Sequence, residues 1–127
     1  NALDALAKYP DLAGMVGLYS YDGPAMLTAV RSAGKAGQVK IVCFDEESDT
    51  LDGIAAGDIY GSIVQMPYKL GFQTIHRMGE YLRGDKSQLA GGKIFTPTRA
   101  ITKANVADFQ AELRMLLEAS LPLSVFP

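Results

Sequence analysis

The chain has 127 residues, a formal net charge of −2, and hydrophobic residues at 48% of its positions. This length suits one domain with a single core. No basic block marks a nucleic-acid or membrane-binding surface, and the longest apolar runs are too short for a membrane span. The single cysteine, Cys43, excludes an internal disulfide.

Segments with strand and helix patterns alternate along the chain. Three apolar runs predict strands at Gly14 to Tyr19, Val39 to Phe44 and Tyr60 to Gln65. Helices are predicted around them, at Leu3 to Ala7, from Asp22 to Gly34, from an N-cap at Ser48 to Gly57, from Tyr68 to Arg83, and after a cap at Asn105. Two short extended pieces are predicted at Ile94-Phe95 and at Arg99 to Thr102. The apolar end, Leu121 to Pro127, holds two prolines and is predicted to be neither helix nor strand.

This alternation predicts an α/β protein with a parallel sheet and right-handed crossovers. Three clear strands make a thin sheet, because a doubly wound domain usually has more. The sequence therefore predicts only part of a doubly wound, Rossmann-like sheet.

The second strand ends abruptly in two acidic residues, Asp45 and Glu46. Its continuous apolar run is typical of a parallel strand covered on both faces. Ligands of open α/β sheets bind just beyond the carboxyl ends of the strands, so Asp45 is a candidate ligand-binding residue. The alternative is a simple turn in which Asp45 or Ser48 caps the next helix.

The ends of all three strands carry side chains suited to a polyhydroxylated ligand: Tyr19, Tyr21, Asp22, Asp45 and Gln65. A carboxylate accepts strong hydrogen bonds from hydroxyl groups, and an amide both donates and accepts. A tyrosine ring can cover the apolar face of a sugar. Two alternatives stay open: the tyrosines are ordinary packing residues, and Asp22 is a helix cap.

Catalytic signatures are absent from the sequence. It contains no phosphate-binding glycine loop after a strand, no cysteine and histidine set with metal-ligand spacing, and no assembled nucleophile and base. The only histidine, His76, falls in the middle of a predicted helix. We therefore predict no enzymatic activity, no catalytic residue, no metal site and no cofactor.

Several linked motifs resemble the periplasmic sugar-binding proteins of the ribose-binding type, which are solute receptors of bacterial ABC importers. The motifs are Val39-Lys40-Ile41-Val42-Cys43-Phe44-Asp45, Leu51-Asp52-Gly53-Ile54 with Gly57, Ile63-Val64-Gln65-Met66-Pro67-Tyr68 with Gly71, and Thr102-Lys103-Ala104-Asn105-Val106. By this resemblance, Asp45 binds sugar hydroxyls and Gln65 is a hinge-side ligand contact. The loop from Tyr19 to Asp22 supplies a further contact. The chain departs from the family in having Asp22 where Asn is common and Cys43 where glycine is usual.

The resemblance also implies where the chain fits in the family fold. Members have two lobes joined by three crossing segments, and this chain matches the later part of the second lobe. We therefore expect residues 1–127 to form a single partial domain, the C-terminal lobe portion of a longer receptor, with hinge crossings within residues 66–102. The receptor is expected to be periplasmic or extracytoplasmic, with a small-molecule sugar and a membrane permease as partners.

Two other functions stay open. The effector domain of a LacI-type transcription regulator shares the fold, but such domains often read Gly-Phe-Asp-Asp where this chain has Cys43-Phe44-Asp45-Glu46. A small α/β enzyme with Asp45 as base would need a nucleophile or cofactor loop. Because the first strand would lose the neighbour that it has in a complete lobe, we also expect this chain, as a fragment, to form a homodimer or larger assembly.

Overall fold

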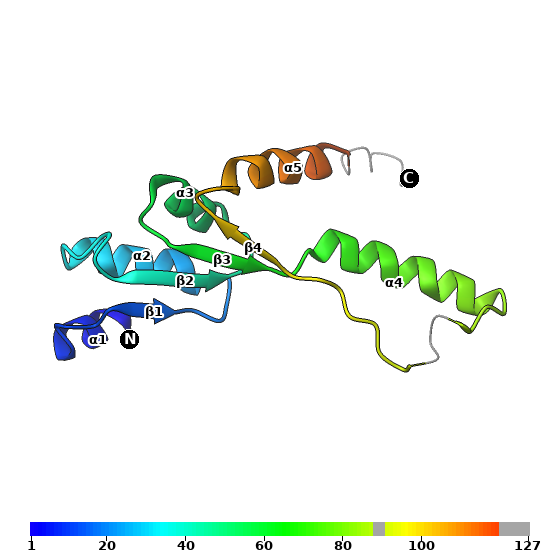
Figure 1. The fold of residues 1–127 in the computed structure, drawn as a ribbon, viewed down its shortest axis with the longest axis horizontal. Helices are drawn as coiled ribbons and strands as arrows, with labels where there is room; N and C mark the ends of the chain where they lie inside the picture. Colours follow the sequence, from blue (N-terminus) through cyan, green and yellow to red (C-terminus); the bar gives the residue numbers. More distant parts are fainter. Residues whose placement is uncertain (88–90, 120–127) are drawn as a thin grey trace, which may run out of the picture. The chain divides into compact units, whose positions relative to one another are not determined.

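A computed structural model of the chain describes residues 1–87 and 91–119. Helices and strands alternate along the chain (Figure 1): α1 Ala2–Lys8, β1 Gly14–Val16, α2 Asp22–Ser32, β2 Lys40–Phe44, α3 Ser48–Ala56, β3 Gly61–Val64, α4 Pro67–Leu82, β4 Arg99–Thr102 and α5 Val106–Ala119. Within these described ranges, no helix is long and apolar enough to cross a membrane. The chain forms two compact units, Asn1–Ile63 with the segment from Ala100, and Val64–Arg99.

The four strands form one sheet in the order β1-β2-β3-β4. β1 and β2 pair in parallel, with Met15 opposite Ile41. β2 and β3 also pair in parallel, with Cys43 opposite Ser62. The arrow of β4 runs against that of β3 in Figure 1. The mostly parallel sheet and its alternating helices confirm the predicted α/β class.

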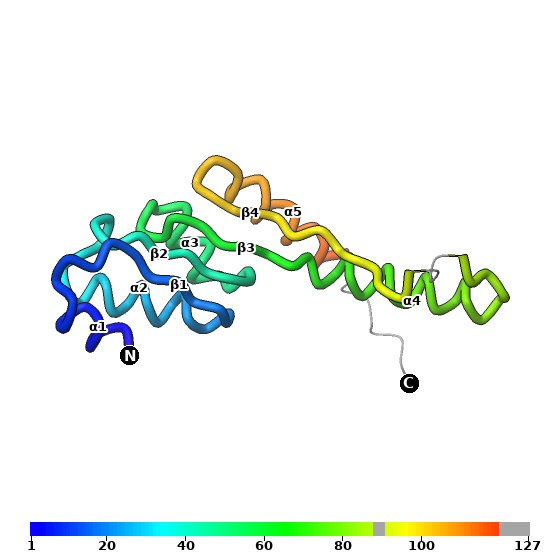
Figure 2. The backbone as a smooth tube through the Cα atoms, turned by 60° about the horizontal axis from the view of Figure 1, so that its bottom comes forward, coloured from blue at the N-terminus to red at the C-terminus, as the bar shows by residue number. Residues whose placement is uncertain are grey.

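The core of the first unit lies on one face of this sheet. Ile41 and Cys43 of β2 have no exposed surface, whereas their neighbours Val42 and Phe44 are half-buried. The strand was predicted to be covered on both faces, and the structure buries one face fully and the other only in part. An apolar run cannot reveal this, because it shows what a strand can bury and not which layers are present. The helical layer includes α1, which packs beside α2 (Figure 2).

Several element ends differ from the sequence-based predictions. β1 ends at Val16 and not at Tyr19, because the chain turns back in a loop closed by the Asp22 N–H bond to the Tyr19 carbonyl. Ser48 begins α3 but does not cap it, since Glu47 occupies the cap position. Ile94-Phe95 forms no strand. Gly57 ends α3 in the left-handed conformation, as predicted (φ 93°).

Two predictions concern the last part of the chain: a cap at Asn105 and an irregular end from Leu121 to Pro127. The Asn105 side chain accepts the N–H of Thr102 and donates to the carbonyl of Ala100, so it fastens the turn that leads from β4 into α5. The prediction for Leu121 to Pro127 lies outside the described residues.

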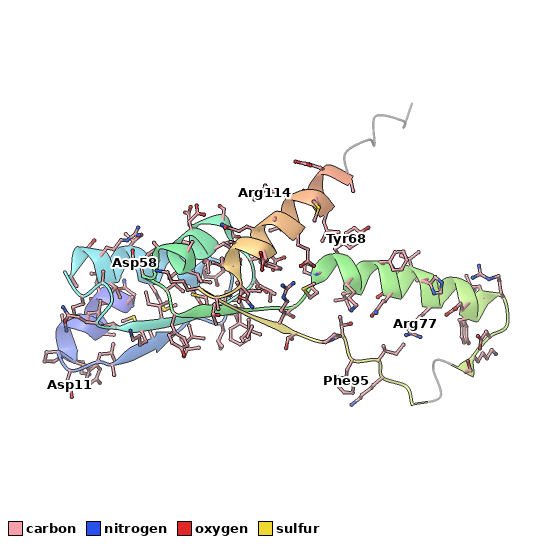
Figure 3. The ribbon with its side chains drawn as sticks, turned by 45° about the horizontal axis from the view of Figure 1, so that its top comes forward. Asp11, Asp58, Tyr68, Arg77, Phe95 and Arg114 are labelled. Atoms are coloured by element: carbon pink, nitrogen blue, oxygen red, sulfur yellow. The ribbon has the colours of Figure 1, made fainter. Side chains whose placement is uncertain are left out.

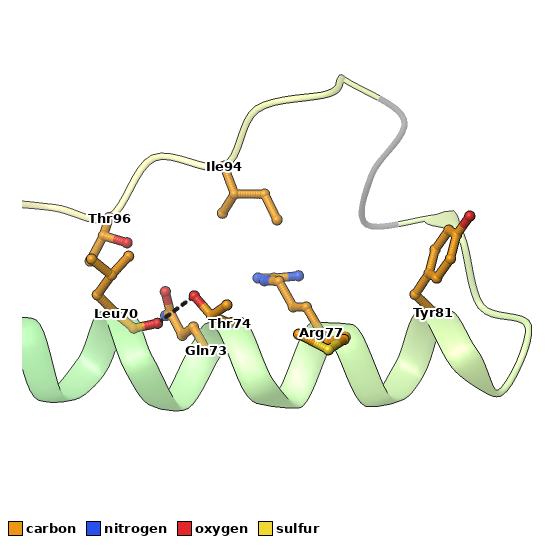
Figure 4. Close-up of a pocket in the computed structure, with 8 residues that line it drawn as sticks. Leu70, Gln73, Thr74, Arg77, Tyr81, Ile94 and Thr96 are labelled. Carbon is orange, nitrogen blue, oxygen red and sulfur yellow. Dashed lines mark hydrogen bonds between the residues drawn. The ribbon is translucent and has the colours of Figure 1, made fainter.

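The second unit is built on α4, which buries none of its residues. Ile75 is 69% exposed, and Phe95 (Figure 3) is 87% exposed. A pocket of about 310 Å³ lies between α4 and residues 94–96 (Figure 4), lined by Leu70, Gln73, Thr74, Arg77, Met78, Tyr81, Ile94 and Thr96. None of the sequence-predicted binding residues lines this pocket.

Candidate functional site

The loop that follows β1 presents two stacked tyrosines. The ring centroids of Tyr19 and Tyr21 lie 5.5 Å apart, and the ring planes differ by only 3°. Tyr19 is 62% exposed and Tyr21 is 66% exposed. Core packing therefore does not account for these rings, because most of each side chain faces solvent. Two parallel aromatic rings offer a flat apolar surface with a hydroxyl group at each edge.

The carboxylate of Asp22 holds this loop in place. Its Oδ2 atom accepts the backbone N–H of Tyr19 at 3.0 Å, and the Asp22 N–H donates to the Tyr19 carbonyl at 2.9 Å. Asp22 is the first residue of α2, while Tyr21 occupies the cap position without a side-chain bond. Asp22 thus closes the loop and does not cap the helix.

Gly17 makes this arrangement possible, although the sequence analysis did not single it out. A Cβ atom on Gly17 would lie 2.4 Å from the Cβ of Asp22, which is too close for any side chain. The only feature of the sequence that could have indicated this role is the glycine itself, which lies between a strand and a tyrosine pair.

Asp45 occupies a strained turn directly after β2. Its φ of 68° lies in the left-handed region, which Asp and Asn tolerate better than most residues. The Asp45 N–H donates to the carbonyl of Ile63 at 3.0 Å, and the Asp45 carbonyl accepts the hydroxyl of Ser62 at 2.7 Å. Both backbone groups of Asp45, its N–H and its carbonyl, therefore tie the turn to β3.

Ser62 is a supporting residue that sequence reasoning missed. It is 1% exposed and lies opposite Cys43 on the buried face of the sheet. Its signal was a lone hydroxyl residue inside an apolar strand. A buried hydroxyl needs a hydrogen-bond partner, and here the partner is the backbone of Asp45.

Carboxylates give this end of the sheet a negative charge. Burial, followed by the nearby charges of Asp45 and Glu47, raises the pKa of Glu46. Burial and then the charge of Asp22 raise the pKa of the Cys43 thiol to about 11. The Cβ position of Gly23, the residue after Asp22, is 3.0 Å from the Cys43 sulfur, so Asp22 lies near the end of β2.

The structure places the five predicted residues in two groups. Tyr19, Tyr21 and Asp22 share one hydrogen-bonded loop, and Asp45 follows the neighbouring strand. Gln65 directly follows β3 in the chain, is exposed, and belongs to the second unit. Its joint participation with the other four stays a prediction.

The described residues hold no group of three or more histidine, cysteine or acidic side chains arranged for a metal ion. His76 lies on α4, where its Nδ1 atom is 3.5 Å from a carboxylate oxygen of Glu80 one helical turn later. His76 is exposed and Glu80 is half-buried, and the two form a local pair on one face of α4.

Comparison with known proteins supplies a family. A family model described as "Periplasmic binding protein domain" matches residues 1–86. No curated protein matches the chain.

Solved structures match over most of this chain. An ABC transporter solute-binding protein from Agrobacterium vitis, bound with α-D-tagatopyranose, is 31% identical with a TM-score of 0.74, covering 84% of this chain and 35% of that one. AraP, an arabinose-binding protein from Geobacillus stearothermophilus, is 26% identical with a TM-score of 0.74, covering 85% and 39%. A second A. vitis solute-binding protein, with bound D-fucose, is 25% identical with a TM-score of 0.72, covering 87% and 37%. The chain thus spans well under half of the length of these structures.

Proposed function

Because this chain belongs to the family of periplasmic binding protein domains, we propose that it binds a sugar or a similar polyol as part of a receptor for an ABC importer. Family members are solute-binding proteins, typically without enzymatic activity and generally extracytoplasmic. We place this chain on the extracytoplasmic side as well, with the importer's membrane permease as its protein partner.

The observation that carries the proposal is the stacked pair of Tyr19 and Tyr21. Large aromatic side chains left more than 60% exposed have no role in the core of the unit. A sugar ring has an apolar face of C–H groups, and a tyrosine ring can cover that face while its hydroxyl stays available for hydrogen bonding. Since the two parallel rings are stacked with their centroids 5.5 Å apart, the ligand would contact an outer face of the pair.

The carboxylates supply the polar contacts in this proposal. Asp45 accepts hydrogen bonds from ligand hydroxyls, and charge-assisted bonds of this kind are the stronger class. The rigid turn that holds Asp45 supports this role, because a preorganised acceptor loses little entropy when the ligand binds. Asp22 both fixes the tyrosine loop and adds negative charge, and Gln65 contributes an amide that donates and accepts.

A titration of the 127-residue chain tests the proposal. We would follow two-dimensional NMR spectra while adding D-tagatose, L-arabinose or D-fucose up to high millimolar concentration. Binding is expected to shift the signals of Tyr19, Tyr21 and Asp45. Loss of one charge-assisted bond costs roughly 1.5–3 kcal/mol, so Asp45→Ala should weaken binding about ten- to a hundredfold.

Asp11→Ala is the matched control, because Asp11 (Figure 3) is an exposed aspartate in the turn before β1. It should leave the affinity unchanged. Equal affinity of the Asp45→Ala variant would remove Asp45 from the site. If none of the sugars shifts the tyrosine signals, the sugar-binding proposal fails for this chain.

We further propose that the chain forms a homodimer or a larger assembly. The observation in support is that β1 is the outermost strand of the sheet that these 127 residues form by themselves, and an outer strand without a partner favours association of this chain on its own.

A further inference from the structure

Asp45 lies where the regular pattern of β2 would bury a charge. Successive side chains of a strand point to opposite faces, so an extended residue 45 would share the face of Ile41 and Cys43, which have no exposed surface. A carboxylate on that face would lose its hydration, which is costly. Asp45 is half-buried instead, and its φ of 68° ends the extended backbone at this residue.

A left-handed backbone at an aspartate needs support from its surroundings. This conformation is uncommon outside glycine, and among the described residues only Asp45 and Met66 adopt it without being glycines. Residues in such sparsely populated regions persist only where neighbouring groups fix them, and they cluster at ligand-binding and active sites. The hydrogen bonds of the two peptide groups that flank Asp45 show what fixes it.

Each of these two peptide groups is bonded to β3. The Asp45 N–H belongs to the peptide shared with Phe44 and donates to the carbonyl of Ile63 at 3.0 Å. The Asp45 carbonyl belongs to the peptide shared with Glu46 and accepts the hydroxyl of Ser62 at 2.7 Å. Rotation about φ or ψ of Asp45 would turn one peptide relative to the other, so the two bonds together fix both angles.

The two bonds differ in what they require of the sequence. The bond from the N–H continues the ladder between β2 and β3, in which Phe44 lies opposite Ile63, and the backbone of any residue 63 could accept it. The bond to the carbonyl needs a side-chain hydroxyl at residue 62. Ser62 is 1% exposed, so little water can compete for this bond. The turn at Asp45 therefore depends on one buried hydroxyl group.

We propose that Ser62 is a positioning residue for ligand binding. By holding the carbonyl of Asp45, it keeps the left-handed turn and so sets the direction in which the Asp45 carboxylate meets the ligand. The inference rests on the proposed function, in which that carboxylate accepts hydrogen bonds from ligand hydroxyls. Ser62 acts through Asp45, because its own hydroxyl is buried and already bonded.

NMR spectra of the ligand-free chain test the effect of Ser62 on the turn. A positive φ brings the N–H and Hα protons of a residue close together, which gives a strong nuclear Overhauser effect (NOE) between them. This NOE should be strong for Asp45 in the unmodified chain and weaker in Ser62→Ala, which lacks only the hydroxyl. The matched control is Thr28→Ala, which loses a hydroxyl bond to the carbonyl of Pro24 in α2 and should leave the Asp45 NOE unchanged.

A double-mutant cycle on sugar affinity tests the connection to the ligand. The sugar is whichever of D-tagatose, L-arabinose and D-fucose binds the unmodified chain most tightly. Ser62→Ala should raise its dissociation constant roughly three- to tenfold, the range that one neutral hydrogen bond contributes. In the Asp45→Ala background the same change should alter the constant by less than about twofold, because the group that Ser62 positions is then absent. Thr28→Ala should have no effect in either background.

Two outcomes overturn the inference: an Asp45 NOE that stays strong in Ser62→Ala, and an equal loss of affinity with and without the Asp45 carboxylate. The second would mean that Ser62 supports the fold and does not act through Asp45. If the unmodified chain binds none of the sugars, the proposed function fails, while the NOE still decides whether Ser62 holds the turn. If far-UV circular dichroism shows that Ser62→Ala does not fold, Ser62→Cys, which has a similar shape and only a weak S–H donor, replaces it in both experiments.

Discussion

At the residue scale, Asp45 shows which part of the candidate site can be predicted from sequence. Its position was predictable, because an apolar strand that ends in an acid places that acid at the carboxyl end of the sheet. Its backbone conformation was not predictable. The positive φ and the bond from Ser62 depend on where β3 lies beside β2, and a single apolar run carries no information about its neighbour.

The same scale gives a pH-dependent prediction for Glu46. Its pKa is raised above the unfolded value near 4.5, mainly by burial. The folded chain therefore favours the protonated acid, and ionised Glu46 lowers stability as pH rises through the folded pKa. Glu46→Gln should stabilise the chain at pH 7, by less than about 1 kcal/mol because solvent screens a half-buried group.

Urea unfolding at pH 7 and at pH 3.5 measures this effect. The advantage of Glu46→Gln should disappear at the lower pH, where the acid is protonated in both states. Glu118→Gln, the same change at an exposed position of α5, should have little effect at either pH. A stabilisation that persists unchanged at pH 3.5 would contradict the electrostatic explanation.

At the element scale, the order and type of the helices and strands followed from sequence, but their contacts did not. The residues Asp22-Gly23-Pro24 were correctly interpreted as a helix start. The structure adds that Gly23 is the point where α2 lies against both β2 and α3. A Cβ atom there would be 2.3 Å from the Thr50 hydroxyl oxygen and 3.0 Å from the Cys43 sulfur. Neither distance can be inferred from the local pattern.

This close contact predicts that Gly23→Ala destabilises the first unit. In most helices alanine is the better residue, by about 0.5–1 kcal/mol. At Gly23 the added methyl group must displace a fully buried threonine, so overpacking should cost about 1–3 kcal/mol instead. Gly71→Ala in α4 is the control with the opposite sign, since nothing lies within 4 Å of its Cβ position. Thermal unfolding of both variants would show the contrast, and a stabilising Gly23→Ala would refute the packing described here.

At the scale of the whole molecule, the two units differ in how far their apolar residues are buried. The first unit has fully buried residues such as Ile41, Ile54 and Ile101. The second unit, Val64–Arg99, has a helix of 16 residues with none buried. Sequence predicted the apolar stripe of α4 from its spacing, but spacing shows only that a face can be buried and not that it is.

The uneven burial predicts two levels of protection in hydrogen exchange. Opening the amides of β2 requires separating the sheet from its helices, so these amides should exchange only through global or near-global unfolding. A helix of this length is marginal in water without packing, so the α4 amides should exchange through local opening, at least about a hundredfold faster. Exchange monitored by mass spectrometry of peptides covering residues 40–44 and 67–82 makes the comparison. Equal protection of the two peptides would mean that α4 is packed against a partner in solution.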